Sequence, residues 1–289
     1  MEQTPRQRSA KVFTHVVFSR DDLLRTGLSG RQITSAVRSG RLTRLRRDRY
    51  VRGDAGDDVM LAAQIGGRVT CLSLLRMLGI FVLEVERLHV HVPRNGSRFT
   101  GHRRGRARVH WGEASDSAFR HVTTLAEAIS HSVRCQDARA ALATLDSLMH
   151  HQFVTRDELT AIFRLLPARF GVLLRLVDPS AASGPETFMR LILRTLGVQY
   201  ETQVWIPHVG YVDFVVEGWL IIECDSKEFH EGWEKQKEDR ARDIAAARVG
   251  YVTVRPLASD ILHATSDTQT AIGQMIEALR PRGGAPHRS

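Results

Sequence analysis

The chain has 289 residues, of which 43% are hydrophobic and 25% are charged. This composition is that of a globular protein with a buried core, and the length suits two or three domains. A run of about 18 uncharged apolar residues is absent, as is the apolar segment of a signal peptide, so we expect no membrane span and a cytoplasmic protein.

The net charge of +9 is concentrated near the N-terminus. Residues 1–54 contain 13 Lys and Arg but only five Asp and Glu, so they carry eight of the nine net positive charges. Such a positive field attracts polyanions, of which DNA is the commonest in a cytoplasm. The alternative interpretation of this charge is a solvated surface that only maintains solubility.

The same segment is predicted to contain two short helices followed by a basic strand pair. Ser19 precedes two aspartates, as at a helix N-terminus, and Gly27 ends that helix. Ser29 caps a second helix over residues 30–39, and an arginine-rich, strand-like stretch, RLTRLRRDRYV, follows. Helix, turn, helix and basic hairpin is the order of a winged helix-turn-helix domain, which we assign to residues 1–54.

Residues 55–177 are predicted to form a connecting domain of mixed α/β structure. The pattern over 58–79 is helical apart from a break at the two glycines 66–67. LHVHV, at 88–92, alternates like a strand, and a short strand, VHW, follows. The stretch 123–165 has the apolar stripe of helices.

Two histidines of this domain, His89 and His91, share one face of the predicted strand and are spaced like metal ligands. No cysteine or acid is expected to complete a site with them nearby, which favours a structural role. The three cysteines, Cys71, Cys135 and Cys224, are far apart and form no CxxC pair. They suggest neither a disulfide framework nor a zinc knuckle, and we expect them to be reduced.

The Pro-, Ser- and Gly-containing stretch at 178–185 is the predicted domain boundary. Residues 183–280 form the next domain, and residues 281–289 are expected to be a disordered tail. The domain begins with a helix and ends with a helix, a strand and a further helix. Between them lie three strands joined by glycine-containing turns, at 203–209, 211–217 and 219–225.

The third of these strands, WLIIECD, is apolar until its end, where Glu223 and Asp225 share one face. Asp213, on the preceding strand, is expected to lie opposite them. Carboxylates at the end of a buried strand repel one another, so their pKa values rise or a cation neutralises them. Oxygen ligands select Mg²⁺ or Mn²⁺, which we expect to be held by Asp213, Glu223 and the carbonyl of Cys224. The alternative is that these acids pair with basic residues such as Arg240 or Lys227.

The motifs VDF and IIECD, followed by a histidine and the charged helix EKQKEDRARDIAAARVGYVTVRP, resemble a known nuclease family. They are similar to the very-short-patch-repair (Vsr)-like branch of the restriction-endonuclease-like PD-(D/E)xK superfamily. The resemblance covers residues 183–265, about a third of the chain, with its parts in the family's order. It implies an α/β/α fold and hydrolysis of DNA phosphodiester bonds with Mg²⁺ or Mn²⁺.

The resemblance also implies roles for individual residues. Asp213 matches the family's metal-binding aspartate, and Glu223 and Asp225 match its acidic pair. Further matches are an acid on the first helix, a histidine after the acidic strand and the DR-x-R-D helix: Glu186, His230, and Arg240 with Asp243. The residues expected to assist catalysis beside the metal ligands are therefore Glu186, Asp225, Lys227 and His230.

The chain departs from the family's pattern at two positions. Ser226 replaces the usual glycine, so the backbone turn there is expected to differ. Asp225 occupies the position of the lysine in the E-x-K motif, and Lys227, two residues further on, is the candidate to replace that lysine. Both departures bear on activity rather than on the expected fold.

Three of the assigned residues also have plainer interpretations. Glu186 could simply complete a capping box with Ser183, and His230 could be an ordinary polar loop residue. Arg240 could contact phosphate, or it could pair on its own helix with Asp243 or Glu238.

The N-terminal segment SGRQITSAVRSGRLTRLRRDRYVRGD resembles the winged-helix domain of the AbiEi-type antitoxins. This resemblance implies DNA contacts from the second helix and from the basic hairpin, or wing. The helix residues are Arg31, Gln32, Ser35 and Arg38, and the wing residues are Arg44, Arg46, Arg47 and Arg49. The alternative is a winged helix that binds protein or only supports the connecting domain.

Together these patterns predict a multidomain protein of the α+β and α/β classes, with a winged helix-turn-helix, a mixed connecting domain and a restriction-endonuclease-like domain. The expected function is DNA binding with metal-dependent endonuclease activity. The alternative is a non-catalytic, antitoxin-like transcriptional regulator with a degenerate nuclease fold. A toxin partner and a homodimer would be expected under that alternative.

Overall fold

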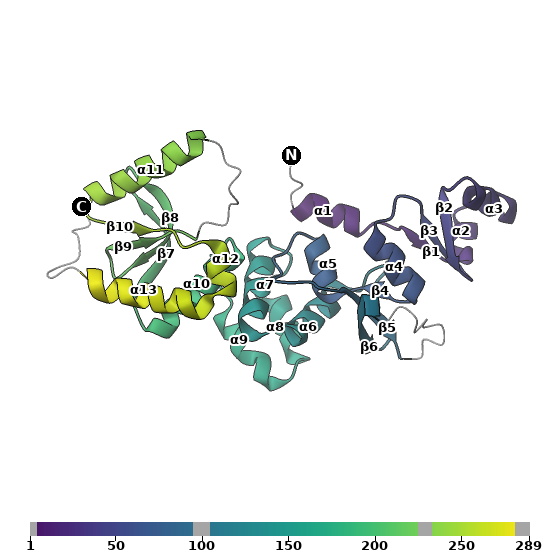
Figure 1. The fold of residues 1–289 in the computed structure, drawn as a ribbon. Coiled ribbons are helices and arrows are strands. Elements are labelled where there is room, and N and C mark those ends of the chain that lie inside the picture. Colours follow the sequence, from purple (N-terminus) through teal and green to yellow (C-terminus); the bar gives the residue numbers. More distant parts are fainter. Residues whose placement is uncertain (1–4, 95–104, 225–232, 281–289) are drawn as a thin grey trace. The chain divides into compact units, whose positions relative to one another are not determined.

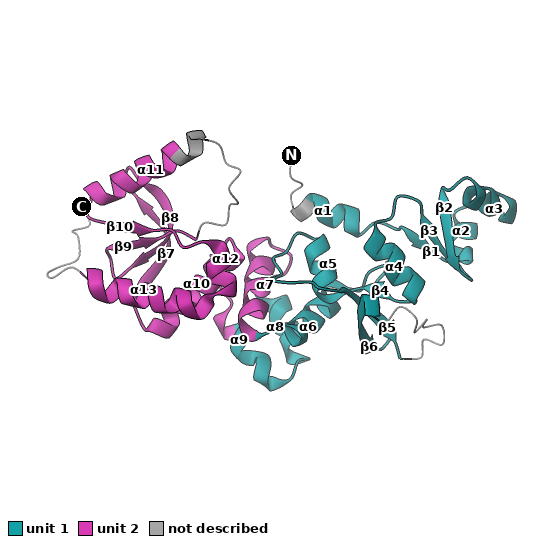
Figure 2. Cartoon of the chain, viewed as in Figure 1, with its two compact units in different colours: residues 1–137, 156–174 teal, residues 138–155, 175–289 magenta. Residues whose placement is uncertain are grey.

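We describe the protein from a computed structural model, in which residues 5–94, 105–224 and 233–280 are described (Figure 1). It is a mixed α/β protein with three small sheets. The chain divides into two compact units, the first formed by residues 1–137 and 156–174 and the second by residues 138–155 and 175–289 (Figure 2). None of the described helices is long and apolar enough to cross a membrane.

The first unit begins with helix α1 (Pro5–Val12) and a small antiparallel sheet of order β1-β3-β2. Its strands are β1 (Val17–Phe18), β2 (Leu42–Arg46) and β3 (Arg49–Arg52). Between β1 and β2 the chain forms helices α2 (Arg20–Arg25) and α3 (Gly30–Arg38). The two helices and the basic strand pair expected from the sequence are confirmed.

Reciprocal capping explains where these helices begin. Ser19 accepts a hydrogen bond from the backbone N–H of Asp22, whose side chain accepts one from the Ser19 N–H, and Ser29 pairs in the same way with Gln32. The helices then bury one face each against the strands, in a shared apolar core that includes Leu23, Ile33, Ala36, Leu42 and Tyr50.

The rest of the first unit surrounds a second sheet, of order β4-β5-β6. β4 (Arg68–Val69) is antiparallel to β5 (Leu88–Pro93), and β5 is parallel to β6 (Ala107–Gly112). The helices of this part are α4 (Asp57–Ile65), α5 (Cys71–Met77), α6 (Leu125–Cys135), α8 (Arg156–Arg164) and most of α9 (Gly171–Leu176).

The helical pattern is interrupted at residues 66–67, as expected, and a short strand follows the interruption. Gly66 ends α4 with a φ of 101°, and the chain then forms the short strand β4 before α5 begins. A side chain at Gly67 would collide with the carbonyl of His91 and the side chain of Val90, so the glycine allows the close approach of β4 to β5. The sequence pattern did not predict this strand, because it is only two residues long.

The second unit contains one four-stranded sheet of order β10-β9-β8-β7. β7 (Tyr200–Ile206), β8 (Gly210–Val216) and β9 (Leu220–Ile222) are antiparallel neighbours, and β10 (Val252–Val254) runs parallel to β9. The helices are α7 (Ala138–His150), α10 (Gly184–Leu196), α11 (Trp233–Arg248), α12 (Ala258–His263) and α13 (Thr265–Leu279). Figure 1 shows α11 on one face of the sheet and α10 and α13 on the other.

The strand boundaries differ from the predicted ones in a way that matters for the acidic residues. The turn between β8 and β9 lies at Glu217 and Gly218, as predicted, with φ values of 51° and 75°. Positive φ at both central residues is the conformation of a type I′ hairpin turn. β9 ends at Ile222, so Glu223 follows the strand rather than lying within it. The predicted tail, 281–289, lies outside the described residues.

A buried ion pair joins α7 to α10 within the second unit. Arg190 Nη2 lies 2.6 Å from Asp146 Oδ2, and the side chains are 4% and 1% exposed. Thr187 donates a hydrogen bond to the same carboxylate, and so does the backbone N–H of Asp178. Burial raises the pKa of Asp146, whereas Arg190 and these donors favour its charged form. α7 is therefore fixed to the core of the second unit by charge as well as by packing.

Candidate functional site

The acidic residues expected to form a site come from three elements of the second unit. Glu186 lies in the first turn of α10, Asp213 in the middle of β8, and Glu223 directly after β9. Asp225, Lys227 and His230 lie outside the described residues. The described part of the site therefore consists of three carboxylates and the groups around them.

Glu186 is held at the N-terminus of α10 by hydrogen bonds to both of its oxygens. Ser183 Oγ donates to Oε1 at 2.8 Å, and the backbone N–H of Ala182 donates to Oε2 at 3.0 Å. Ser183 also caps the helix, as its hydroxyl accepts from the Glu186 N–H. The capping relation proposed from the sequence is thus present, but it uses the Ala182 amide instead of the Ser183 amide. The buried side chain of Glu186 also accepts a hydrogen bond from Gln203, on strand β7.

Gln203 connects Glu186 to Asp213. It lies on β7 between the pairs Thr202–Phe214 and Val204–Val212, so its position is opposite Asp213. Its side-chain Nε2 donates to Glu186 Oε2 at 3.1 Å and to Asp213 Oδ1 at 3.4 Å. One amide group therefore brings two carboxylates from separate elements to the same place.

The other oxygen of Asp213 is oriented by the backbone. The N–H of Cys224 donates to Asp213 Oδ2 at 2.8 Å, which links the end of β9 to the middle of β8. Asp213 and the segment after β9 thus come together as predicted.

Burial raises the pKa of all three carboxylates above its ordinary value. For Glu186 the second cause is the negative charge of Asp213. For Asp213 burial is partly offset by the hydrogen bonds from Cys224 and Gln203. For Glu223 it is partly offset by the positive charge of Arg242. The site thus concentrates negative charge in a poorly hydrated region, which a bound cation or proton would relieve.

Glu223 is the acid that basic residues neutralise most directly. Arg242, on α11, donates from Nη2 to Glu223 Oε1 at 2.9 Å, and Arg255, just after β10, has its Nη2 at 3.7 Å from the same oxygen. Arg255 also donates to Asp243 at 3.0 Å. The partners of Glu223 among the described residues are thus Arg242 and Arg255 rather than Arg240, and Lys227 lies outside the described residues.

Arg242 was not among the predicted site residues, although it is the second arginine of the DR-x-R-D motif. It also donates to two backbone carbonyls, those of Val209 and Tyr211, at 2.9 and 2.6 Å. Arg240, the first arginine of the motif, is exposed. Gln203 was missed as well, and the only signal for it was its position opposite Asp213 in the predicted hairpin.

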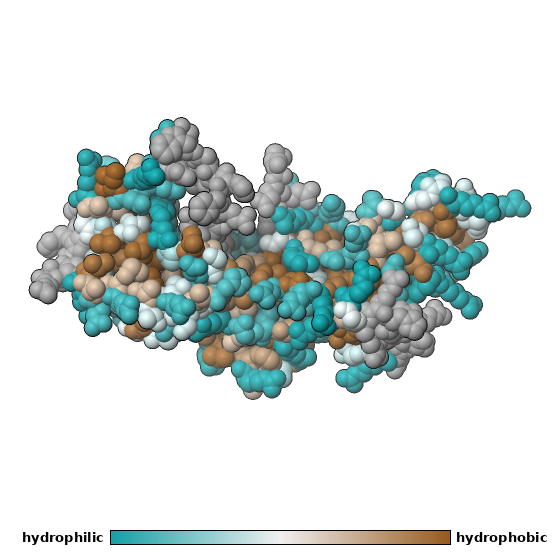
Figure 3. All heavy atoms as spheres, in the orientation of Figure 1, coloured by the Kyte–Doolittle hydropathy of each residue, from teal (hydrophilic) through white to brown (hydrophobic). Residues whose placement is uncertain are grey.

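The predicted DNA-binding residues on α3 lie at the surface. Arg31, Gln32, Ser35 and Arg38 are all exposed, whereas Ile33 and Ala36 face the core. Gln32 also takes part in the capping box described above, because its Oε1 accepts from the Ser29 N–H at 2.8 Å. Hydrophilic side chains surround the outer end of α3 (Figure 3).

The four arginines of the predicted wing differ in exposure. Arg44 and Arg47 are exposed, while Arg46 and Arg49 are half-buried. The guanidinium of Arg46 lies against Gly66 at the end of α4. Burial, together with the charges of Arg46 and Arg120, lowers the pKa of Arg49 to about 10. Arg44 and Arg47 are therefore the wing residues best placed to reach a phosphate.

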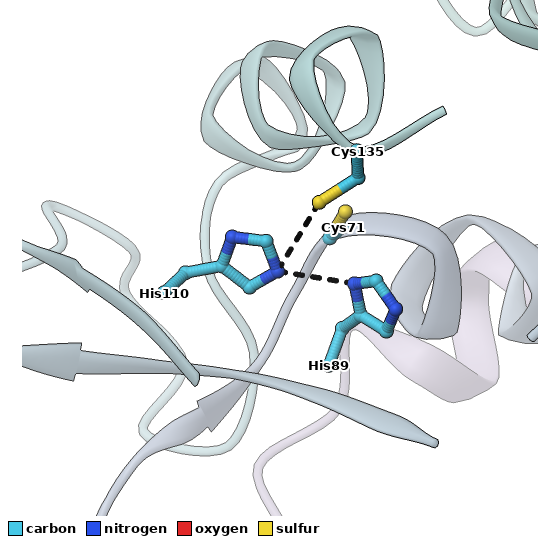
Figure 4. Close-up of side chains that lie close together, drawn as sticks. All are labelled: Cys71, His89, His110 and Cys135. Carbon is cyan, nitrogen blue, oxygen red and sulfur yellow. Dashed lines mark hydrogen bonds between the residues drawn. The ribbon is translucent and has the colours of Figure 1, made fainter. Parts of the chain in front are cut away.

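The expectation that no cysteine completes a site near His89 is wrong. Cys71 and Cys135 lie beside His89 and His110 in the first unit (Figure 4). His91 is not in this group, and its Nε2 lies 2.8 Å from the Glu113 carbonyl oxygen while its ring stacks on His131.

Among the described residues, these two cysteines and two histidines are the group whose ligand atoms lie close enough together for one metal ion. The described acids are not such a group. To bind one ion, Glu186, Asp213 and Glu223 would need side-chain movements or a ligand from outside the described residues. The chain matches no protein-family model and no curated protein.

Proposed function

We propose that residues 183–280 form a Mg²⁺- or Mn²⁺-dependent DNA endonuclease-like domain and that residues 1–54 bind DNA as a winged helix-turn-helix. The observation that carries the proposal is the meeting of two carboxylates, the buried Glu186 and the half-buried Asp213, at the side-chain amide of Gln203. A helix N-terminus and a central strand supply them. Buried acids that share one site are a common arrangement for metal-dependent phosphodiester chemistry.

The layering of the second unit supports the fold implied by the Vsr-like resemblance. Helices cover both faces of its sheet, with α11 on one side and α10 and α13 on the other (Figure 1). The acids lie where β8, the end of β9 and the start of α10 meet. An α/β/α arrangement with acids on adjacent strands is what the motifs VDF and IIECD lead us to expect.

The donor atoms around Asp213 suit a hard cation, because carboxylate oxygens are the ligands that Mg²⁺ and Mn²⁺ prefer. Asp213 and Glu186 would hold the ion, and Glu223 and the carbonyl of Cys224 would be its further ligands. When bound, the ion would polarise a phosphoryl oxygen and lower the pKa of a bound water.

The surrounding side chains would position these ligands and the substrate. Gln203 would fix the separation of Glu186 and Asp213, and the Cys224 N–H would fix the orientation of Asp213. Arg242 and Arg255 would offset the negative charge of a phosphate that approaches the acids.

The charge of the first 54 residues supports the DNA-binding part of the proposal. The exposed side chains of α3, the second of the two capped helices, are followed by Arg44 on β2 and Arg47 in the turn after it. Arginine suits both phosphate contacts and bidentate contacts to guanine. This region would supply the affinity for DNA, and the acidic site would hydrolyse the phosphodiester bond.

The test is cleavage of supercoiled plasmid by the purified full chain in Mn²⁺ or Mg²⁺. Nicking is expected, and the variants Asp213→Asn and Glu186→Gln should lose it. Changes to residues around metal ligands already cost about 10- to 100-fold, so loss of a ligand should cost at least as much. The matched control is Glu277→Gln, which neutralises an exposed acid on α13. Nicking that survives Asp213→Asn would remove this site from the proposal.

One observation favours the alternative of a non-catalytic, antitoxin-like regulator. Glu223 is paired with Arg242 and lies near Arg255, which itself pairs with Asp243. In a degenerate nuclease fold, such ion pairs would take over the charge neutralisation that a metal ion provides. DNA binding without metal-dependent cleavage of any plasmid would favour this alternative.

A further inference from the structure

Two cysteines and two histidines in the first unit form a group that lies apart from the acidic residues in sequence. We call Cys71, His89, His110 and Cys135 the Cys2His2 cluster. Each side chain offers one ligand atom, and these atoms all lie within 4.8 Å of one another. Figure 4 shows both sulfur atoms and both imidazole rings directed towards the same point.

Four separate elements bring the cluster together. Cys71 is the first residue of α5, two residues after the end of β4, and Cys135 is the last residue of α6. His89 and His110 lie on the parallel strands β5 and β6. The register pairs His91 with His110 and His89 with Arg108, so the two histidines of the cluster are diagonal neighbours on adjacent strands.

The backbone on both sides of the cluster is fixed by hydrogen bonds. The N–H of His89 donates to Ser73 Oγ at 2.9 Å, and its carbonyl accepts from the N–H of Thr70 at 3.0 Å. Cys71 has a φ of 54°, a left-handed conformation that is unfavourable for a residue with a side chain. Strained conformations of this kind persist only where the surrounding structure enforces them, and they cluster at functional sites.

The distances between ligand atoms agree with tetrahedral coordination. His89 Nδ1 lies 3.0 Å from His110 Nε2, and Cys135 Sγ lies 3.8 Å from the same nitrogen. In a tetrahedral zinc site with ordinary bond lengths, two nitrogens are roughly 3.3 Å apart and a nitrogen and a sulfur roughly 3.6 Å apart. Shifts of a few tenths of an ångström would therefore give these pairs tetrahedral spacing, and Cys71 Sγ, within 4.8 Å of the other ligand atoms, would complete the site.

The surroundings of the cluster orient its ligands. His131 stacks on the ring of His110 with 4.6 Å between centroids, and its Nδ1 lies 3.0 Å from Thr70 Oγ1. Thr70 in turn hydrogen-bonds Thr123 at 2.8 Å. The His131 ring, held by Thr70, thus packs against His110 and restricts the orientation of that ligand's ring.

The chemistry of the donors selects the metal. Two thiolates and two imidazoles in a tetrahedral arrangement favour Zn²⁺ over Mg²⁺ or Mn²⁺, which prefer oxygen. Cys71 and His89 are buried, and four protein ligands leave no position for a water or substrate, as in structural rather than catalytic zinc sites. We propose that the Cys2His2 cluster binds one Zn²⁺ ion, which ties α5 and α6 to the β5–β6 sheet.

The first experiment is to measure the metal content of the full chain, purified without chelators and with a reductant, by inductively coupled plasma mass spectrometry. About one zinc per chain is expected, and Cys71→Ser and Cys135→Ser should each lower that content at least severalfold. The matched controls are Cys224→Ala, at the third cysteine, and His208→Asn, at an exposed histidine whose φ of 64° asparagine tolerates. Both controls should keep one zinc per chain.

A second measurement does not depend on the variants folding. The metal-free wild-type chain is titrated with Co²⁺ and followed by absorption spectroscopy. Intense visible bands and a thiolate-to-cobalt charge-transfer band, which saturate at one equivalent and disappear on adding Zn²⁺, are expected. The proposal would be overturned if the chain as purified contained no zinc and the titration gave only the weak spectrum of hydrated Co²⁺. A Cys71–Cys135 disulfide found by mass spectrometry in the freshly purified, metal-free protein would also overturn it.

Discussion

Arg242 donates a hydrogen bond of 2.9 Å to Glu223, and this ion pair connects α11 to the end of β9. The same guanidinium donates to the carbonyls of Val209 and Tyr211. Arg242 therefore holds three parts of the second unit together, and it does so beside the candidate site.

Replacing Arg242 by Met should destabilise the protein by about 2 kcal/mol, because it leaves a partly buried carboxylate and two carbonyls without their donor. The change is measured by urea denaturation. Arg240→Met is the control, since Arg240 is an exposed residue of the same helix, and it should change the free energy of unfolding by less than about 0.5 kcal/mol. A loss of less than about 0.5 kcal/mol for Arg242→Met as well would show that the Arg242 contacts contribute little to stability.

Replacing Asp146 by Asn should destabilise the second unit more strongly, by about 3 kcal/mol. The change leaves the charge of Arg190 in a buried position without its partner, and breaking one side of a buried ion pair costs several kcal/mol. Thermal or urea unfolding measures the loss, with Glu277→Gln as a surface control. Wild-type stability of Asp146→Asn would mean that this carboxylate is not charged in the folded protein.

The pH dependence of stability should report on Asp213. Burial raises the pKa of this carboxylate in the folded protein above its ordinary value of 3.8. The folded state therefore binds the proton more tightly than the unfolded state does, and stability falls as the pH rises through the raised pKa. Asp213→Asn carries no such charge, so at neutral pH and without metal the variant should be more stable than the wild type.

The advantage of Asp213→Asn should disappear as the pH is lowered towards 3.8, where the wild-type carboxyl is protonated as well. Adding Mg²⁺ or Mn²⁺ at neutral pH should stabilise the wild type and leave the variant unchanged. Urea denaturation at several pH values, with and without the ion, measures both effects. A variant less stable than the wild type at every pH would contradict the argument.

Salt dependence tests the contribution of the wing to DNA binding. Each phosphate contact adds about 0.9 to the slope of log affinity against log salt concentration. Because Arg44 and Arg47 are exposed, the double variant Arg44→Ala/Arg47→Ala should lower that slope by about 1 to 2. Arg87→Ala/Arg164→Ala removes two exposed charges elsewhere in the first unit and is the matched control. A slope that is the same for the wild type and both double variants would exclude the wing from the interface.

Removing zinc should lower the stability of the first unit. A ligand present at 100 times its Kd stabilises the folded state by about 2.7 kcal/mol, so a strong chelator should lower the unfolding temperature by several degrees. Calorimetry with and without chelator measures this shift. Cys71→Ser should unfold at the same temperature in both conditions, because it has no complete site to lose.

Local features of the fold were predictable from the sequence because they depend on neighbouring residues. Ser19 and Ser29 start helices since their hydroxyls can accept from backbone N–H groups three residues on. Glu217 and Gly218 form the predicted hairpin turn, and the apolar run before Glu223 forms a buried strand. Strand pairing then explains why Asp213 and the residues after β9 meet.

Features that depend on distant elements were not predictable in the same way. Arg240 and Arg242 are two positions apart on one helix and so point in different directions, and only the packing of α11 decides which of them reaches Glu223. The Cys2His2 cluster has no short-range spacing motif, because its four members are distributed over residues 71–135. Gln203 gains its role only when β7 pairs with β8.

The second unit is not continuous along the chain, since α7 belongs to it while α8 returns to the first unit. The polypeptide thus passes between the units three times, near residues 137, 155 and 174. A fragment that starts at residue 178 would contain α10 without α7 and would leave Arg190 inside without Asp146. Neither unit therefore corresponds to one uninterrupted segment of the chain, so neither can be excised or exchanged with a single pair of boundaries.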